Sequence, residues 1–162
     1  MEKMYFGTQR LVCQPLKKTK DIPAFCHLIN EPHVQEFFRI GDAFDFLQEL
    51  ESYACFPVGV FCCAKDRKLI GYINGYVYNR ANHELLVEFF LSGNYYNFDY
   101  VAELLNAYVN NCRKIGFTTF LFHVQESDTD LLSFMSNMTA AHLIDKDFTD
   151  ESGRNMQVYR IL

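Results

Sequence analysis

A chain of 162 residues with a formal net charge of -5 at pH 7 has the length of a single domain, and its charge argues against a nucleic-acid-binding surface. Hydrophobic residues make up 49% and charged residues 22% of the sequence, which is typical of a globular protein that builds its core without disulfides or metals. No segment is long and apolar enough to span a bilayer, and the first six residues lack an apolar signal region. We therefore expect a cytoplasmic protein that binds neither nucleic acid nor membranes.

The cysteine and aromatic content narrows the possibilities further. The six cysteines include no Cys-x-x-Cys pair and no histidine at zinc-ligand spacing, so we expect free, buried thiols and no metal site. Cys62 and Cys63 are adjacent in an expected strand and would therefore face opposite sides of a sheet. Phe and Tyr make up 16% of the sequence, with no Trp, which indicates either a Phe-rich core or an aromatic-lined pocket.

The N-terminal half begins with one strand and three short helices and then changes to strands. We expect a strand over residues 8–14 and helices over 22–29, 31–38 and 44–53. Asp21 and Asp42 precede the first and third helices and are expected to cap them. Three strands follow as a meander, over residues 57–64, 69–78 and 84–91.

The strand over residues 84–91 runs through a short polar turn into an amphipathic helix. Apolar residues recur at helical spacing in this helix, at Val101, Leu104, Leu105, Tyr108 and Val109. The helix is expected to end at Gly116. A strand over 117–124, a helix over 131–138 capped by Asp128, and a pair of strands over 142–148 and 156–161 complete the chain. This order predicts an α/β (α+β) fold with helices on the faces of a mixed sheet.

Four segments, together with the order of the elements, resemble the GNAT superfamily of acyl-CoA N-acyltransferases, and among them the ribosomal-protein alanine acetyltransferases. The segments are Arg10-Leu-Val-Cys-Gln-Pro-Leu, Asn30-Glu-Pro-His-Val-Gln-Glu-Phe-Phe, Lys68-Leu-Ile-Gly-Tyr-Ile-Asn-Gly-Tyr and Gly153-Arg-Asn-Met-Gln-Val-Tyr. The resemblance covers nearly the whole chain. It implies a single GNAT-like domain over residues 1–162, with a mixed, mostly antiparallel sheet of about seven strands flanked by helices on both faces.

The resemblance also implies that the protein moves an acetyl group from acetyl-CoA to an amine. The main chain of Phe89, Phe90 and Leu91 would bind pantetheine, and the following turn would hold the pyrophosphate. Members of the superfamily carry Gln/Arg-x-x-Gly-x-Gly/Ala in that turn, because glycines let phosphate approach the backbone. Here the turn offers Asn94, Tyr96, Asn97, Phe98, Asp99 and Tyr100.

Asn97 and Asp99 stand where the two later glycines of the motif would be, so the motif is degenerate. Asn tolerates left-handed backbone geometry, which makes Asn97 a mild departure. A carboxylate at position 99 would repel pyrophosphate, and it is also a good helix cap. We expect Asp99 to cap the helix in place of a phosphate.

Glu88 is the candidate catalytic base, because acetyl transfer requires a proton to leave the attacking ammonium. Its side chain lies either in the cleft or on an exposed face of the sheet. Phe134 stands where many relatives carry a proton-donating Tyr. Ser127 or Asp128 replaces an Asn often found after the fifth strand; Ser127 could bond to the pantetheine arm, although either residue also suits a helix cap.

His123, His33, Tyr72 and Tyr76 are the candidate residues for the acceptor. A lone histidine among apolar residues, such as His123, is also typical of a core. The acceptor would be a small-molecule or peptide amine, and a homodimer is an open alternative to a monomer. A second hypothesis is a catalytically inactive GNAT-fold protein that has lost acetyl-CoA binding and uses the fold to bind a partner.

Overall fold

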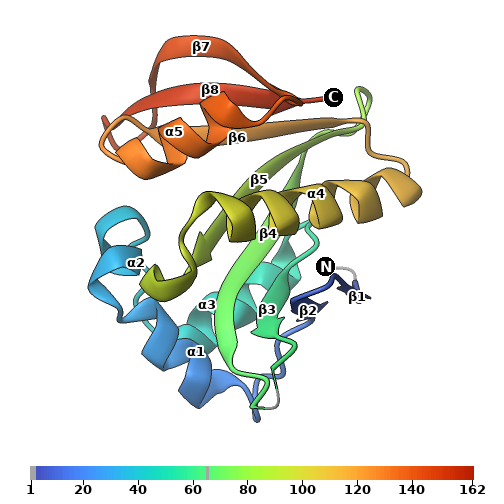
Figure 1. Cartoon of the computed structure of the whole chain (residues 1–162), viewed down its shortest axis with the longest axis vertical. Coiled ribbons are helices and arrows are strands. Elements are labelled where there is room, and N and C mark those ends of the chain that lie inside the picture. The colour runs from blue at the N-terminus through green and yellow to red at the C-terminus, as the bar shows by residue number, and fades with distance from the viewer. Residues whose placement is uncertain (1–2, 65) are drawn as a thin grey trace. The chain divides into compact units, whose positions relative to one another are not determined.

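One sheet contains every strand that the structure describes. A computed structural model describes residues 3–64 and 66–162 (Figure 1). Its strands are β1 (Phe6–Gly7), β2 (Leu11–Gln14), β3 (Val58–Cys62), β4 (Leu69–Asn79), β5 (Glu84–Leu91), β6 (Thr119–Gln125), β7 (Ala141–Thr149) and β8 (Asn155–Ile161). They follow the order β1-β2-β3-β4-β5-β6-β8-β7. The pairs β1–β2, β2–β3, β3–β4, β6–β8 and β7–β8 are antiparallel, and β5 pairs with β6 in parallel, which confirms a mixed, mostly antiparallel sheet.

The sheet has eight strands rather than the expected seven, because the N-terminal strand is a hairpin. The prediction of one strand over residues 8–14 is wrong in this respect. The N–H of Thr8 donates to the carbonyl of Leu11 over 2.8 Å, and the N–H of Leu11 donates to Thr8 Oγ1 over 3.0 Å. These bonds close a tight turn between β1 and β2.

The helices begin at side-chain caps in three of five cases. The helices are α1 (Ile22–Ile29), α2 (Pro32–Phe37), α3 (Ala43–Glu49), α4 (Phe98–Lys114) and α5 (Thr129–Asn137). Asp42 and Asp128 accept hydrogen bonds from the N–H groups of Asp45 and Leu131, as expected. Asp21 does not cap α1. Its backbone is already helical, and its carboxylate instead accepts a bond from the N–H of Lys17 over 2.6 Å.

Contacts divide the residues into two compact units, and β4 and β5 each run through both. The first unit comprises the chain up to Tyr76 together with Phe89–Tyr96. Its core joins α1, α2 and α3 to the strands. Phe25, Phe46, Tyr72 and Phe90 form an aromatic cluster in that core, with ring centroids 5.2–6.3 Å apart. Much of the aromatic content therefore serves packing here.

The second unit comprises Val77–Glu88 and Asn97–Leu162. In it, α4 buries the apolar face that its sequence predicts, together with Cys112. The helix is followed by Gly116, whose φ of +104° is a conformation that favours glycine. Strand β6 is paired with β5 on one side and β8 on the other, and most of its residues are buried.

The cysteines carry no disulfide among the described residues. Cys62 is buried at the end of β3, and Cys63 is exposed just beyond the strand, so the two do not occupy the adjacent strand positions that the sequence predicts. None of the helices in the described part of the chain has the length and hydropathy of a membrane-spanning segment. Within the same residues, no cluster of three or more His, Cys, Asp or Glu side chains is arranged to hold a metal ion. Residues 1 and 2, at the start of the N-terminal segment predicted to lack a signal region, lie outside the described residues.

Candidate functional site

Glu88 lies on β5, which has the bounds that the sequence predicts. The parallel register with β6 runs from Glu84–Thr119 to Leu86–Leu121, two residues before Glu88. The Glu88 side chain is half-buried, so it is neither sealed in the core nor fully exposed. A half-buried carboxylate can exchange protons with water, which is one requirement for a general base.

The turn that follows β5 is held by the carboxylate of Glu31, the residue that precedes α2. The Ser92 side chain is buried, and its hydroxyl donates to Glu31 Oε1 over 2.9 Å. The N–H of Gly93 donates to the same oxygen over 3.3 Å, while the N–H of Ser92 donates to the carbonyl of Ile70 over 2.7 Å. Glu31 therefore fixes the start of the turn. The sequence indicates Glu31 only as the start of a helix, because its partners are 61 and 62 residues away.

The middle of the turn closes on itself and packs against the same helix. The N–H of Tyr95 donates to the carbonyl of Ser92, and that of Tyr96 donates to the carbonyl of Gly93, forming a 3-10 turn. The Tyr96 ring lies 4.4 Å from the His33 ring, centroid to centroid. Two predicted site residues, His33 and Tyr96, are thus brought into contact, and two N–H groups of the turn are already used.

Asn97, not Asp99, caps α4, so the expected role of Asp99 is wrong. Asn97 has extended backbone geometry, and its Oδ1 accepts a hydrogen bond from the N–H of Tyr100 over 3.1 Å. A capping side chain must precede the N–H groups that it satisfies, whereas Asp99 already lies in the first turn of the helix. Asp99 is exposed, and its carboxylate makes no hydrogen bond or ion pair within residues 3–64 and 66–162.

Two N–H groups at the start of α4 remain available. Those of Phe98 and Asp99 have no hydrogen-bond acceptor among the residues that the structure describes. The first N–H groups of a helix carry the positive end of its dipole, and they commonly bind anions. The start of α4 can therefore still accept a phosphate, although the Asp99 carboxylate lies next to it in the chain.

The side chains of Phe89, Phe90 and Leu91 are buried, which leaves their main chain as the polar part that a ligand could reach. The neighbouring strand approaches closely at Gly71. A Cβ atom there would lie 2.7 Å from the carbonyl oxygen of Phe90 and 2.5 Å from Leu91 Cδ2. Glycine is therefore required at position 71, because any side chain would collide with β5.

The predicted acceptor residues of the first unit differ in burial. Tyr72 is fully buried in the aromatic cluster, which is a core position rather than a pocket wall. Tyr76 is half-buried, and its ring lies 6.0 Å from that of Tyr53. His33 and Tyr76 are therefore the accessible candidates in this unit.

In the second unit, Ser127 and Asp128 lie between β6 and α5. Asp128 is the cap of this helix, while Ser127 is exposed beside it and has no capping role. Phe134 lies on α5, with its ring 6.4 Å from that of Phe98 at the start of α4. Phe134 therefore fills an apolar position and offers no proton to a leaving group.

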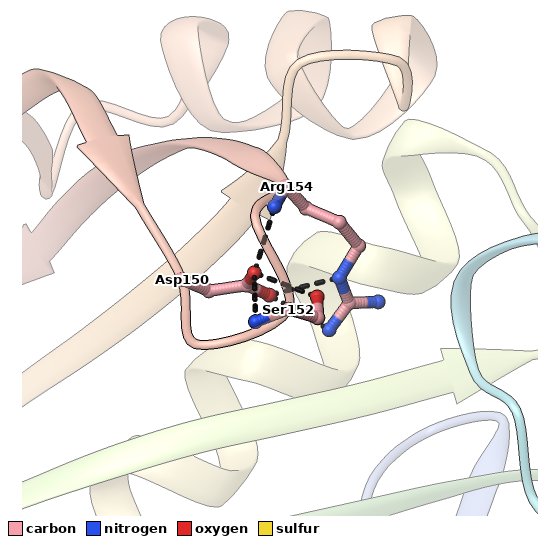
Figure 2. Close-up of polar contacts among 3 residues, drawn as sticks. All are labelled: Asp150, Ser152 and Arg154. Carbon is pink, nitrogen blue, oxygen red and sulfur yellow. Dashed lines mark hydrogen bonds and ion pairs between the residues drawn. The ribbon is translucent and has the colours of Figure 1, made fainter.

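His123 is half-buried on β6 and packs against Phe148, with ring centroids 4.8 Å apart. Burial lowers the pKa of His123, and the negative charge of Asp150 partly offsets this effect. Asp150 belongs to the turn between β7 and β8, where it binds Ser152 and Arg154 (Figure 2). A neutral imidazole packed at an angle of 46° against a phenyl ring agrees with the core alternative for His123.

No family model matches the sequence, and no curated protein is similar to it in sequence. Solved structures do share its fold. A GNAT-family acetyltransferase from Bacillus anthracis has a TM-score of 0.80 at 16% identity, with 98% of each chain covered. RimL, a ribosomal L7/L12 alpha-N-protein acetyltransferase, has a TM-score of 0.78 at 11% identity, over 100% of this chain and 96% of that one.

A third neighbour was solved with ligands. The microcin C7 self-immunity acetyltransferase MccE, in complex with acetyl-CoA and AMP, has a TM-score of 0.75 at 11% identity, over 96% of this chain and 94% of that one. The chain therefore has the fold of the GNAT acetyltransferases, including that of a ribosomal-protein acetyltransferase. This confirms the fold that the resemblance implies.

Proposed function

We propose that this protein is an N-acetyltransferase that moves an acetyl group from acetyl-CoA to an amine. One observation carries the proposal beyond the shared fold: Asn97 caps α4 and leaves the N–H groups of Phe98 and Asp99 without an acceptor in the described chain. A pyrophosphate would accept hydrogen bonds from these N–H groups, which lie at the positive end of the helix dipole. The neighbour MccE, with its bound acetyl-CoA, supports the choice of acetyl donor.

The proposed chemistry uses few side chains. Glu88 accepts a proton from the ammonium of the acceptor, directly or through water, and the free amine attacks the thioester carbonyl. The new C–N bond forms as the C–S bond breaks, the nitrogen loses its second proton to water, and the coenzyme A thiolate takes a proton from water. Water has this role because Phe134 has no proton to donate. A half-buried Glu88 suits the step, since its proton must return to solvent after each turnover.

The remaining predicted residues are assigned to binding. The main chain of Phe89–Leu91 would hold the pantetheine arm, and residues 94–100 would surround the pyrophosphate. Ser127 could contact the pantetheine arm from the start of α5. His33, Tyr76 and His123 are the candidates for contact with a small-molecule or peptide amine, and Tyr72 would support them from the core.

Acetyl-CoA binding is the first test. A ligand at about a hundred times its dissociation constant stabilises a protein by about 2.7 kcal/mol, so acetyl-CoA should raise the melting temperature. Desulfo-coenzyme A lacks the thioester sulfur and should give a similar shift if the phosphates carry the binding. The absence of any shift at millimolar acetyl-CoA would contradict the proposal.

Glu88→Gln separates catalysis from binding. The variant should lose about a hundredfold or more in the rate of coenzyme A release with an amine-peptide panel, because general base catalysis contributes about that much. The thermal shift with acetyl-CoA should be unchanged. Glu84→Gln, on the same strand, is the matched control and should retain the rate. Equal rates for Glu88→Gln and wild type would remove Glu88 from the mechanism.

An interaction protein without a cofactor is the second candidate, and a separate observation favours it. Glu31 accepts the N–H of Gly93, and the N–H groups of Tyr95 and Tyr96 are used within the turn. Only part of the turn is then free to bind phosphate. If acetyl-CoA produces no shift in wild type or in Glu31→Gln, this second function is supported.

A further inference from the structure

A cavity in the first unit is lined by none of the residues proposed for acetyl transfer. It is a cavity of about 360 Å³, which falls within the usual range of small-molecule sites, roughly 300–1,000 Å³. The cavity is lined by the N-terminal segment, by residues 14–18 at the end of β2 and just after it, by the end of α3 with the turn that follows, and by the start of β3. None of its lining residues belongs to β5, to the turn after it, or to α4.

The floor of the cavity is apolar. Leu47, Leu50 and Val58 contribute to its lining, with exposed fractions of 6%, 2% and 0%. Leu16 lies over Gly59, where a Cβ atom would be only 2.5 Å from Leu16 Cδ2. Because Gly59 has no side chain, Leu16 packs directly against the backbone of β3. A ligand with an apolar body would bury its surface on this floor.

The rim of the cavity is positively charged, in a chain whose net charge is negative. Three lysines, Lys3, Lys17 and Lys18, line it against one acid, Glu51. Lys18 is already neutralised, because its Nζ lies 2.6 Å from Glu51 Oε1. The ammonium groups of Lys3 and Lys17 have no acidic partner among residues 3–64 and 66–162. The rim therefore holds two uncompensated positive charges beside an apolar floor.

The two free lysines come from different parts of the sequence. Lys17 belongs to the basic cluster Lys17, Lys18 and Lys20, for which the sequence indicates nothing beyond a solvated turn. Lys20 does not line the cavity, whereas Lys3 joins it from the N-terminal segment. Gln14 and Tyr5 add polar side chains at the same rim. Cations and hydrogen-bonding groups around an apolar floor are the usual arrangement for holding an organic anion.

We propose that this cavity binds a small organic anion, with its carboxylate or phosphate between Lys3 and Lys17 and its apolar body on the floor of Leu16, Leu47, Leu50 and Val58. Lysine is a flexible point charge and does not select planar carboxylates over phosphates. The site is separate from the proposed acetyl-transfer site, so a ligand can bind here whether or not acetyl-CoA binds. The ligand is an acidic metabolite or an effector rather than the acetyl donor.

Octanoate is a suitable probe, because it joins one carboxylate to an apolar chain. The full-length, ¹⁵N-labelled protein would be titrated with sodium octanoate and followed by amide chemical shifts. We expect saturable shifts in residues 14–18 and 47–51. Octyl phosphate should shift the same amides, and the tighter of the two anions identifies the preferred head group. Shifts confined to other parts of the chain, or none with either anion, would overturn the proposal.

Two further probes separate charge from apolar contact. 1-Octanol has the same chain without the charge, and inorganic phosphate has the charge without the chain. Each should bind at least about tenfold more weakly than octanoate, because each lacks one of the two interactions. Equal binding of octanol would overturn the role of the lysines. Acetyl-CoA should leave bound octanoate in place, and its displacement would overturn the separation of the two sites.

Variants test the individual residues. Lys17→Met keeps the apolar part of the side chain and should weaken octanoate binding about tenfold. Lys20→Met, from the same basic cluster but outside the cavity, is the matched control and should bind as wild type does. Gln14→Trp fills the cavity from the half-exposed end of β2 and should abolish binding, with circular dichroism confirming the fold. Unchanged binding in Lys17→Met and Gln14→Trp would refute the site.

Discussion

In the turn between β7 and β8, the carboxylate of Asp150 accepts hydrogen bonds from the N–H groups of Ser152 and Arg154 and from the Ser152 hydroxyl, and it pairs with the Arg154 guanidinium at 2.8 Å (Figure 2). At the start of α4, the carboxylate of Asp99 accepts no hydrogen bond within the described chain, and the nearest N–H groups are left open. In the β7–β8 turn, the Asp150 carboxylate accepts the hydrogen bonds of the nearby N–H groups. At the start of α4, the Asp99 carboxylate accepts none.

The difference follows from the position of the acid relative to the N–H groups. Asp150 precedes its donors by two and four residues, as Asn97 precedes the N–H of Tyr100 by three. Asp99 lies within the first turn of its helix, and its carboxylate accepts none of the N–H groups of the described chain. An aspartate in a turn therefore blocks an anion site only when it precedes the N–H groups of that turn.

The largest effect on stability is expected from replacing Asn97. Asn97→Ala removes the α4 cap and should lower the free energy of unfolding by about 1 kcal/mol, or the melting temperature by about 3 °C for a chain of this size. Asp99→Asn keeps the shape of the side chain and should cost less, because Asp99 satisfies no N–H group. Thermal unfolding of both variants checks the assignment. A larger loss for Asp99→Asn than for Asn97→Ala would mean that Asp99 is the cap.

The same Asp99→Asn variant should bind acetyl-CoA more tightly. Removing a negative charge beside the open N–H groups should lower the dissociation constant about threefold at low salt, and less at high salt because ions screen exposed charges. Calorimetric titration at two ionic strengths measures both changes. Asp130→Asn is the matched control, since Asp130 is also an exposed acid in the first turn of a helix. An equal gain in both variants would point to net charge rather than to this turn.

The smallest effect is expected in the β7–β8 turn, where stability should depend on pH. The Ser152 hydroxyl, followed by the main chain of Arg154, lowers the pKa of Asp150 from 3.8 to about 2. Because the folded pKa is lowered, the stability contributed by Asp150 is present above about pH 4 and is lost as the pH falls towards 2. Ser152→Ala should raise the Asp150 pKa and start this loss at a higher pH. A carboxyl NMR titration would reveal it, and Ser136→Ala should leave the Asp150 pKa unchanged.

Local patterns were sufficient to predict most elements. The bounds of β5, the buried face of α4 and the caps Asp42 and Asp128 are all as the sequence predicts. Each depends on residues within a few positions of one another, so a periodic pattern or a capping residue reveals it. The caps Asp21 and Asp99 were misassigned, because an aspartate near a helix start satisfies an N–H group only with the right backbone geometry.

The sequence by itself determined the order of strands and helices, apart from the β1–β2 hairpin, and through that order the fold. Only the tertiary structure decided which groups meet: Glu31 with Ser92, 61 residues apart, and Lys3 with Lys17 around one cavity. Hydrogen bonds within a turn depend on local dihedral angles, which the residue types restrict. Contacts between distant segments depend on the path of the whole chain through the sheet, which no short pattern encodes. Whether a carboxylate occupies the N–H groups of a turn or leaves them free for a ligand therefore depends on the tertiary structure.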